Sequence, residues 1–321
     1  MSDIKELVSG VQSGSRRALA RLITRIESTR GDHRAEAQEV LAELLPQTGK
    51  SLRIGISGVP GVGKSSFIET FGLHVIEQGH KVAVLAVDPS SPKHGGSILG
   101  DKTRMENLAR HPDAFVRPSP SGGSMGGVAR RTRETILATE ASGFDVILIE
   151  TVGVGQSEYA VADLVDMFVL LVAPGGGDDL QGIKKGIVEM ADLLVVTKDD
   201  GDLAKAASRA FQDYRSAIHM LRTGNELWRP HVLRCSAHTG TGISEVWDKM
   251  AEYGKIMRDA GAIDNKRAEQ AASWMWDEVT ATLIDRVRQK NDVADSLEAD
   301  VRAGKITPTD AAHKLIGRFN D

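Results

Sequence analysis

Cysteine is almost absent from this chain, because Cys235 is the only one in 321 residues. A single cysteine excludes an internal disulfide and any metal site built from several cysteines. No apolar run reaches the roughly 18 residues that a membrane-spanning helix needs. The start, MSDIKELVSGVQSG, lacks an apolar signal segment and an Arg/Ser-rich transit sequence. The formal net charge of −4 gives no global reason to expect nucleic acid. These absences predict a cytoplasmic protein with neither a membrane nor a nucleic-acid partner.

Residues 1–50 show the periodicity of helices. Apolar residues recur at helical spacing in two stretches, and Pro46 and Gly49 are expected to end the second helix. The first stretch carries arginines at positions 16, 17, 21 and 25. They form either a basic surface for acidic lipid or, the interpretation that we favour, a solvated face of a helix packed on the core.

From Ser51 onward the sequence contains short, nearly continuous apolar runs, namely LRIGISG, KVAVLAVD, DVILIETVG, DMFVLLVAP, DLLVVTKDD and HVLRCSA. Helical patterns separate several of them, for example Phe67, Phe71 and Val75. This alternation predicts an α/β protein whose mostly parallel sheet is covered by helices on both faces. Ligands of such sheets bind outside the carboxyl ends of the strands. We therefore expect a helical extension over 1–50, a nucleotide-binding domain over 51–254 and a helical segment over 255–321.

The last part of the chain contains helical patterns only. Apolar residues form a stripe at helical spacing that consists of Trp276, Val279, Leu283, Ile284 and Val287. Two further apolar residues, Leu297 and Val301, follow the stripe. The later stretch ITPTD predicts a helix start with Thr307 as N-cap, Pro308 at the first position and Asp310 in the first turn. The stripe packs either on the main sheet or, as an arm, against another subunit.

The stretch GVPGVGKSS matches G-x-x-x-x-G-K-[ST] between an expected strand and an expected helix. A loop without bulky side chains can turn its N–H groups toward phosphate oxygens, and the following helix adds its partial positive charge. Lys64 is expected to reach the outer phosphates and the Ser65 hydroxyl to hold Mg²⁺. The predicted phosphate-binding residues are Gly58, Val59, Pro60, Gly61, Val62, Gly63, Lys64, Ser65 and Ser66.

TKDD, residues 197–200, fits the guanine-reading pattern [NT]-K-x-D and ends an apolar run. Asp200 can accept from the ring N–H and the exocyclic amine of guanine, a donor pair that adenine lacks. The stem of Lys198 can lie along the base plane. Thr197 replaces asparagine, so one lateral hydrogen bond of the pattern is in question. CSA, residues 235–237, ends the next run and resembles the loop whose backbone N–H reads the guanine oxygen. The predicted base site is completed by Ser236, Ala237 and the following His238. Cys235 is interpreted as a small buried residue.

Three carboxylates are candidates for magnesium ligation beside Ser65. Glu150 ends a buried run with Gly153 three residues later, which resembles D-x-x-G with glutamate in place of aspartate. Asp88 closes another run, and Asp101 lies in the following Gly-rich loop. Magnesium keeps several waters, so we rank Ser65 and Glu150 above Asp101 and Asp88. Asp88 has the alternative role of a helix cap. Lys64, Glu150 and Gly153 are the predicted catalytic residues.

Position 154 is valine, where the small-GTPase pattern has a glutamine that orients the attacking water. We therefore expect slow hydrolysis that a partner or a second subunit accelerates. Two Gly-rich stretches, 91–105 and 173–186, are expected to respond to the bound phosphate. A solvated surface connection is the alternative for each.

Taken together, GVPGVGKSS, VDPSSP, GDKTRM, ETVGVGQSE, PGGGDDLQGIKKG and TKDDGD resemble the metallochaperone-type P-loop GTPases, specifically the branch called MeaB, ArgK or, in animals, MMAA. The resemblance covers nearly the whole chain. It implies a GTPase chaperone that gates cofactor loading into adenosylcobalamin-dependent methylmalonyl-CoA mutase and protects that enzyme. It also implies a homodimer joined by the C-terminal segment, and an additional switch that contains Gln181 and Lys184.

Two other functions remain open. One is a kinase-like regulator of arginine/ornithine transport, against which the guanine-reading TKDD argues. The other is a regulatory module that binds GTP and scarcely hydrolyses it. Direct handling of a transition metal is disfavoured, because the chain has one cysteine and scattered histidines.

Overall fold

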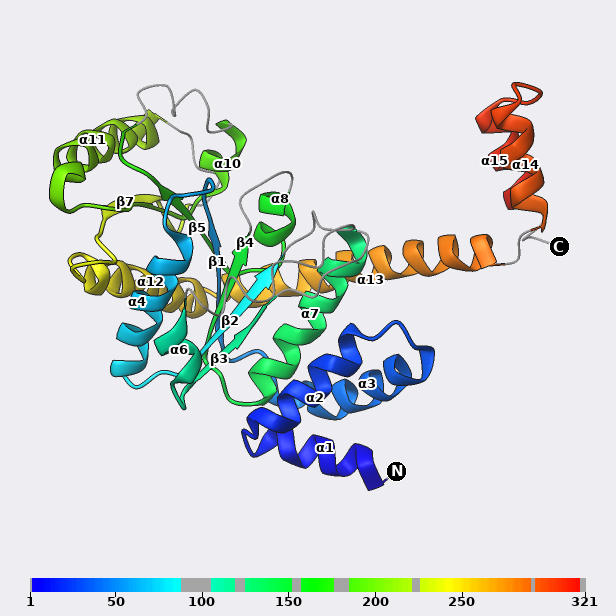
Figure 1. Cartoon of the computed structure of the whole chain (residues 1–321), viewed down its shortest axis with the longest axis horizontal. Helices are drawn as coiled ribbons and strands as arrows, with labels where there is room; N and C mark the ends of the chain where they lie inside the picture. Colours follow the sequence, from blue (N-terminus) through cyan, green and yellow to red (C-terminus); the bar gives the residue numbers. More distant parts are fainter. Residues whose placement is uncertain are drawn as a thin grey trace. The chain divides into compact units, whose positions relative to one another are not determined.

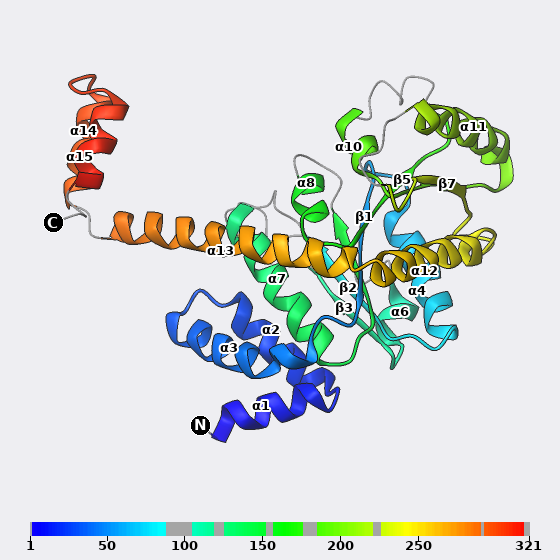
Figure 2. The same ribbon diagram turned by 180° about the vertical axis from the view of Figure 1, so that it is seen from behind.

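The structure, a computed structural model, describes residues 2–87, 105–118, 125–151, 157–175, 185–220, 226–289 and 292–317. The chain divides into two compact units, Met1–Ala268 and Glu269–Asp321. Figures 1 and 2 show it from opposite sides. The division at residues 50 and 254 that the sequence suggests stays a prediction. Among the described residues, no helix combines the length and the apolar character that crossing a membrane requires.

A seven-stranded parallel sheet forms the centre of the first unit, in the order β3-β2-β4-β1-β5-β6-β7. Because β1 lies between β4 and β5, the sheet order reverses beside β1, where open α/β sheets bind their ligands. The α/β class is thereby confirmed. The strands are β1 (Leu52–Ser57), β2 (Val82–Val87), β3 (Ala114–Arg117), β4 (Val146–Thr151), β5 (Met167–Val172), β6 (Leu193–Val196) and β7 (His231–Arg234).

Helices pack on both faces of this sheet (Figures 1 and 2). Those of the first unit are α1 (Ser2–Gln12), α2 (Arg16–Glu27), α3 (Gly31–Leu44), α4 (Lys64–Glu77), α6 (Glu106–Arg110), α7 (Met125–Ala141), α8 (Ser157–Ala162), α10 (Lys185–Met190), α11 (Ala204–Met220) and α12 (Ile243–Asp259). Short 3-10 turns cover Leu45–Gln47 and Gly201–Leu203. Helix α13 (Ala262–Gln289) continues into the second unit, which also holds α14 (Asp292–Arg302) and α15 (Pro308–Gly317).

The main core lies on the face of the sheet that α4, α6 and α12 cover. Ile54 and Ile56 of β1 share this core with Phe67 and Phe71 of α4, and all four side chains are fully buried. The two phenylalanine rings stack with their centroids 5.2 Å apart. Helix α4 begins at the lysine of the Gly-rich loop, so this packing fixes the start of the helix against the end of β1.

A buried charge network closes the opposite end of the sheet. Asp166, fully buried, accepts hydrogen bonds from the backbone N–H of Arg53 at 2.8 Å and from Nε of Arg267 at 2.7 Å. Glu140 of α7 pairs with Arg53 through two hydrogen bonds of 2.9 Å. Burial raises the pKa of Glu140, but the bonds and charge of Arg53 outweigh that effect and hold the pKa below its ordinary value. The paired charges attach α7 and the start of α13 to the bases of β1 and β5.

Most of the expected elements are present, with two differences. Six strands coincide with the apolar runs, whereas β3 was not predicted. Three helices occupy the first fifty residues, because α1 precedes the two expected ones. The predicted helix start near the C-terminus is confirmed, since Thr307 Oγ1 accepts the Asp310 N–H at 3.2 Å.

Candidate nucleotide site

The predicted site residues that the structure describes gather at one edge of the sheet. The Gly-rich loop follows β1, Glu150 is the penultimate residue of β4, and residues 197–200 and 235–238 follow β6 and β7. All these strands run parallel in neighbouring positions, with β5 between β1 and β6. Their carboxyl ends therefore meet, as a ligand site of this sheet type requires.

Glycine is required at both ends of the loop between β1 and α4. A Cβ on Gly58 would lie 2.6 Å from the carbonyl oxygen of Leu171, a distance that no side chain tolerates. Gly63, the residue before α4, has a φ of 99°, a conformation that L side chains rarely adopt. Between them, Val59 and Pro60 are exposed, and Ser66 lies in the first turn of α4. The loop thus carries little side-chain bulk where its N–H groups have to approach phosphate.

Lys64 is held close to this loop. Its side-chain nitrogen donates to the carbonyl oxygens of Gly58 at 2.7 Å and Val59 at 3.4 Å, and the residue is only 8% exposed. Burial lowers the pKa of Lys64, an effect that the negative charges of Glu150 and Glu158 oppose. A positively charged group that donates only to neutral carbonyls can exchange them for phosphate oxygens.

Ser65 and Glu150, the two magnesium ligands that the sequence ranks highest, lie side by side in the structure. The Ser65 hydroxyl lies 3.4 Å from Oε1 of Glu150, and Glu150 is 7% exposed. A hydroxyl beside a buried carboxylate at the start of a phosphate-binding helix is a donor set that fits Mg²⁺. The buried Thr151 hydroxyl donates to Oγ of Ser57 at 3.1 Å and so joins the ends of β4 and β1.

The base motif is bonded directly to the Gly-rich loop. The Thr197 hydroxyl donates to the carbonyl oxygen of Val62 at 2.7 Å, and the Lys198 ammonium donates to that of Gly61 at 2.7 Å. The threonine hydroxyl thus makes a lateral hydrogen bond that the missing asparagine amide had put in question. Lys198 has a φ of 57°, the only positive value at a non-glycine residue among the described ones. Such a backbone is uncommon outside glycine and is often found at functional sites.

Asp200 is oriented by the loop after β7. The Ser236 hydroxyl donates to Oδ2 of Asp200 and its oxygen accepts the backbone N–H groups of His238 at 3.2 Å and Thr239 at 3.1 Å. The carbonyl oxygen of Ala237 accepts the hydroxyl of Thr70 from α4 at 2.8 Å. Loop and aspartate are therefore fixed relative to the phosphate helix, which favours reading of a base at a defined distance from the phosphates.

Comparison with known proteins agrees with this arrangement. The sequence profile of the family described as "Methylmalonyl Co-A mutase-associated GTPase MeaB" matches residues 19–292. The chain belongs to the MeaB family of GTPases. A protein of Caulobacter vibrioides whose name describes it as a GTPase is 53% identical over 320 residues, covering 99% of this chain and 98% of that protein. The mitochondrial methylmalonic aciduria type A homolog of Mus musculus is 48% identical, covering 98% of this chain and 79% of that protein.

A solved structure shares the fold over the full length. It is described as a "LAO/AO transport system kinase" and superimposes with a TM-score of 0.78 and 35% sequence identity, covering 100% of this chain and 98% of that chain. As a member of the MeaB family, the chain is a GTPase that binds a guanine nucleotide. The Gly-rich loop and the base motif are the parts of the described structure that fit this activity.

Several predicted residues lie outside the described part of the structure. They include Asp88 and Asp101 as metal ligands and Gly153 as a catalytic residue. The two predicted switch residues, Gln181 and Lys184, also lie there. Their roles stay predictions.

The single cysteine of the chain is not a reactive group of this site. Cys235 is 1% exposed, and burial raises its pKa to about 12, with the charge of Asp199 adding to the effect. A thiol with such a pKa is not a nucleophile at neutral pH. The structure thus confirms that Cys235 is a small buried residue.

Glu158 also lies in this region, although no motif in the sequence indicates it. It lies in the first turn of α8, is 7% exposed, and its charge acts on Lys64. The signal that could have found it is the glycine at position 55, in the middle of an otherwise apolar strand, because this glycine admits α8 close to β1.

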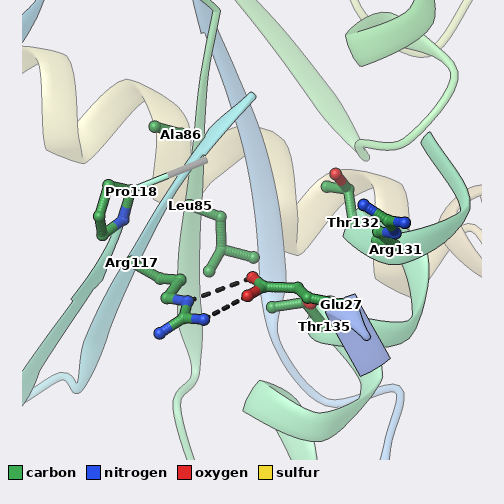
Figure 3. Close-up of a pocket in the computed structure, with 8 residues that line it drawn as sticks. All are labelled: Glu27, Leu85, Ala86, Arg117, Pro118, Arg131, Thr132 and Thr135. Atoms are coloured by element: carbon green, nitrogen blue, oxygen red, sulfur yellow. Dashed lines mark hydrogen bonds and ion pairs between the residues drawn. The ribbon is translucent and has the colours of Figure 1, made fainter. Parts of the chain in front are cut away.

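A separate pocket opens at the carboxyl ends of β2 and β3 and contains none of the predicted site residues (Figure 3). Its walls come from α2, β2, β3 and α7. The carboxylate of Glu27 accepts two hydrogen bonds from the guanidinium of Arg117. In one of them, Nε of Arg117 lies 3.2 Å from Oε1 of Glu27. This ion pair joins the N-terminal helices to the edge of the sheet. The lining residues are Glu27, Leu85, Ala86, Arg117, Pro118, Arg131, Thr132 and Thr135.

Proposed function

We propose that this GTPase is a chaperone of adenosylcobalamin-dependent methylmalonyl-CoA mutase that gates loading of the cofactor and protects the mutase from inactivation. The observation that carries the proposal is the match of residues 19–292 to a family described as mutase-associated. The name of the mouse relative, which refers to methylmalonic aciduria, supports the same assignment.

The chemistry that we propose is magnesium-dependent hydrolysis of GTP. Lys64 binds the outer phosphates, while Ser65 and Glu150 hold Mg²⁺; Asp88 and Asp101 are the further candidate ligands. The ion would neutralise charge on the phosphates. The chain has Val154 where small GTPases carry the water-orienting glutamine, so hydrolysis is slow until the partner or a second subunit completes the site. Gln181 and Lys184 relay the state of that partner.

The proposal is tested by co-purification from cell extract. The tagged protein is bound to resin in GDP and, in parallel, in a non-hydrolysable GTP analogue. We expect a cobalamin-dependent mutase to be retained in an amount that differs between the two nucleotides, because the switch segments respond to the γ-phosphate. Equal retention in both states, or no mutase in either, would contradict the chaperone role.

We further propose that the protein is a homodimer joined by the C-terminal arm. Helix α13 exposes part of the apolar stripe identified in the sequence. Trp276, Val279 and Leu283 recur every three to four residues, which places them on one face of the helix. The exposed fraction is 64% for Trp276 and 54% for Leu283. Met275 and Ile284 are also exposed and flank this face.

Replacing both Trp276 and Leu283 by aspartate should convert the dimer to a monomer, because two charges would then face the apolar partner surface. Sedimentation equilibrium should give the mass of one chain in place of two. Ala281→Asp is the matched control, since Ala281 is exposed and lies on roughly the opposite face of α13. A wild-type chain that sediments as a monomer would refute the dimer.

One alternative function has a specific observation in its favour, namely the description of the similar solved structure as a transport system kinase. A kinase would transfer the phosphoryl group to a protein in place of water. Asp200 belongs to the motif whose Thr197 and Lys198 contact the phosphate loop. Its carboxylate favours guanine and disfavours this alternative. If ATP displaced labelled GDP as effectively as GTP does, the kinase would become the better assignment.

A further inference from the structure

Glu158 is a buried carboxylate that lacks a full set of hydrogen-bond partners. It is 7% exposed, and its Oε2 has no hydrogen-bond partner among the described residues. The buried carboxylates at the other end of the sheet are different, because Glu140 and Asp166 both pair with arginine. A buried carboxylate without such bonds costs free energy. A position of this kind is characteristic of a functional residue.

The backbone places this carboxylate next to the phosphate loop. Helix α8 packs on β1 at Gly55, where a Cβ would lie 3.0 Å from Cγ1 of Val161 and 3.2 Å from Cγ2 of Val165. The glycine therefore allows α8 to approach the strand three residues before the loop begins. The negative charge of Glu158 acts on the ammonium of Lys64, as that of Glu150 does. Both carboxylates thus lie within electrostatic range of the group that receives the outer phosphates.

The two carboxylates have different surroundings. Glu150 lies at the end of β4 and contacts Ser65, so it belongs to the proposed magnesium site. Glu158 comes from α8, on the face of the sheet opposite α4, and makes no contact with Ser65 that the described structure records. Near a triphosphate, a second carboxylate is repulsive unless it accepts a hydrogen bond from a neutral donor. The attacking water is such a donor.

We propose that Glu158 is a further catalytic residue that orients the attacking water in GTP hydrolysis. Its carboxylate accepts a hydrogen bond from the water and holds the oxygen toward the γ-phosphorus. The water oxygen forms a bond to that phosphorus, and the bond from phosphorus to the β–γ bridging oxygen breaks. One water proton stays on the attacking oxygen and the other passes to a phosphate oxygen of the product, so GDP and inorganic phosphate are released. Glu158 thereby orients the attacking water, which the valine at position 154 has no polar group to do.

The test compares Glu158→Leu, which removes every hydrogen-bond acceptor, with Glu158→Gln, which keeps an oxygen that can accept a bond from the water as the glutamine of small GTPases does. Single-turnover hydrolysis by Glu158→Leu should be slower by about a hundredfold, the lower end of the range for such groups. Glu158→Gln should retain more of the rate. Affinity for a non-hydrolysable GTP analogue should be unchanged or tighter in Glu158→Leu, because a negative charge near the phosphates is lost. Its melting temperature should not fall, since the buried carboxylate lacks a full set of partners.

Glu77→Leu is the control, because Glu77 is an exposed glutamate at the end of α4; it should leave rate and affinity unchanged. The proposal is overturned if Glu158→Leu hydrolyses GTP within about twofold of the wild-type rate. It is also overturned if Glu158→Gln is as slow as Glu158→Leu, or if rate, affinity and melting temperature of Glu158→Leu fall together. Those results would assign Glu158 a structural role.

Discussion

Replacing Lys64 by alanine should weaken the binding of GDP and of non-hydrolysable GTP analogues by about a hundredfold. Hydrogen bonds to charged groups contribute about 1.5–3 kcal/mol each, and two of them to the phosphates correspond to roughly two orders of magnitude in Kd. The side chain is already beside the loop, where it donates to Gly58 and Val59. Exchange of these carbonyl oxygens for phosphate needs little movement. Isothermal titration with both nucleotides would measure the loss.

The control for this variant is Lys255→Ala, which removes an exposed lysine from α12. Both variants should keep the fold, as circular dichroism would show, because the P-loop lysine makes hydrogen bonds only to neutral carbonyls in the described structure. If Lys64→Ala bound GDP with wild-type affinity, the phosphates would have to bind elsewhere. An equal loss in Lys255→Ala would indicate a general effect of charge.

The sequence predicted the strands whose runs are apolar throughout or lead into a recognisable motif. Five of the six predicted strands, β1, β2, β4, β5 and β6, are buried at most of their positions, so their interiors read as continuous runs. Strand β7 has no buried position, but CSA follows it directly and marks its end. Strand β3 has only three apolar residues, Ala114–Val116, before Arg117 and Pro118, and no site motif follows it. So short a run at the edge of a sheet is recognised only when β2 is seen to pair with it through residues 82–85.

The site was predictable wherever one local segment carries the chemistry. The Gly-rich loop and TKDD need particular backbone conformations and donor patterns at fixed spacing, and the spacing is visible in the sequence. The bond from Thr197 to Val62 was not predictable, because it joins residues 135 positions apart. Glu158 was missed for a similar reason. Its burial depends on the packing of α8 against Gly55, and a glutamate near a helix start otherwise reads as a solvated residue.

The contacts between the two motifs have a consequence for binding. Lys198 donates to Gly61 while its Cε lies 3.9 Å from the position of a Cβ on Gly63. The stem of the lysine thus crosses the phosphate loop and can also support the plane of a base. Because Thr197 contacts the same loop, base and phosphate subsites are held by one set of bonds. Because the two subsites are held at a fixed separation, they suit a ligand that carries base and phosphates on one molecule, which is a nucleotide.

Substitution of Asp200 by asparagine should change the base that the protein prefers. The carboxylate accepts from the ring N–H and the amine of guanine, whereas an amide presents a donor to that edge. GDP should bind about a hundredfold more weakly, since two bonds to a charged group of about 1.5 kcal/mol or more each are lost. Xanthosine diphosphate has a carbonyl oxygen where guanine has the amine, so its affinity should rise. Competition against a fluorescent guanine nucleotide would measure both.

Asp199→Asn is the matched control for this change. Asp199 is the neighbouring residue, but its carboxylate pairs with Nε of Arg234 at 3.3 Å and its backbone N–H donates to Cys235. Asp200 instead accepts the hydroxyl of Ser236, which can also donate to an asparagine oxygen. The substituted amide would then keep the orientation of the carboxylate and turn its N–H group toward the base. If Asp199→Asn altered base preference as strongly, or if Asp200→Asn lost GDP without gaining xanthosine diphosphate, the base would be read by other groups than this aspartate.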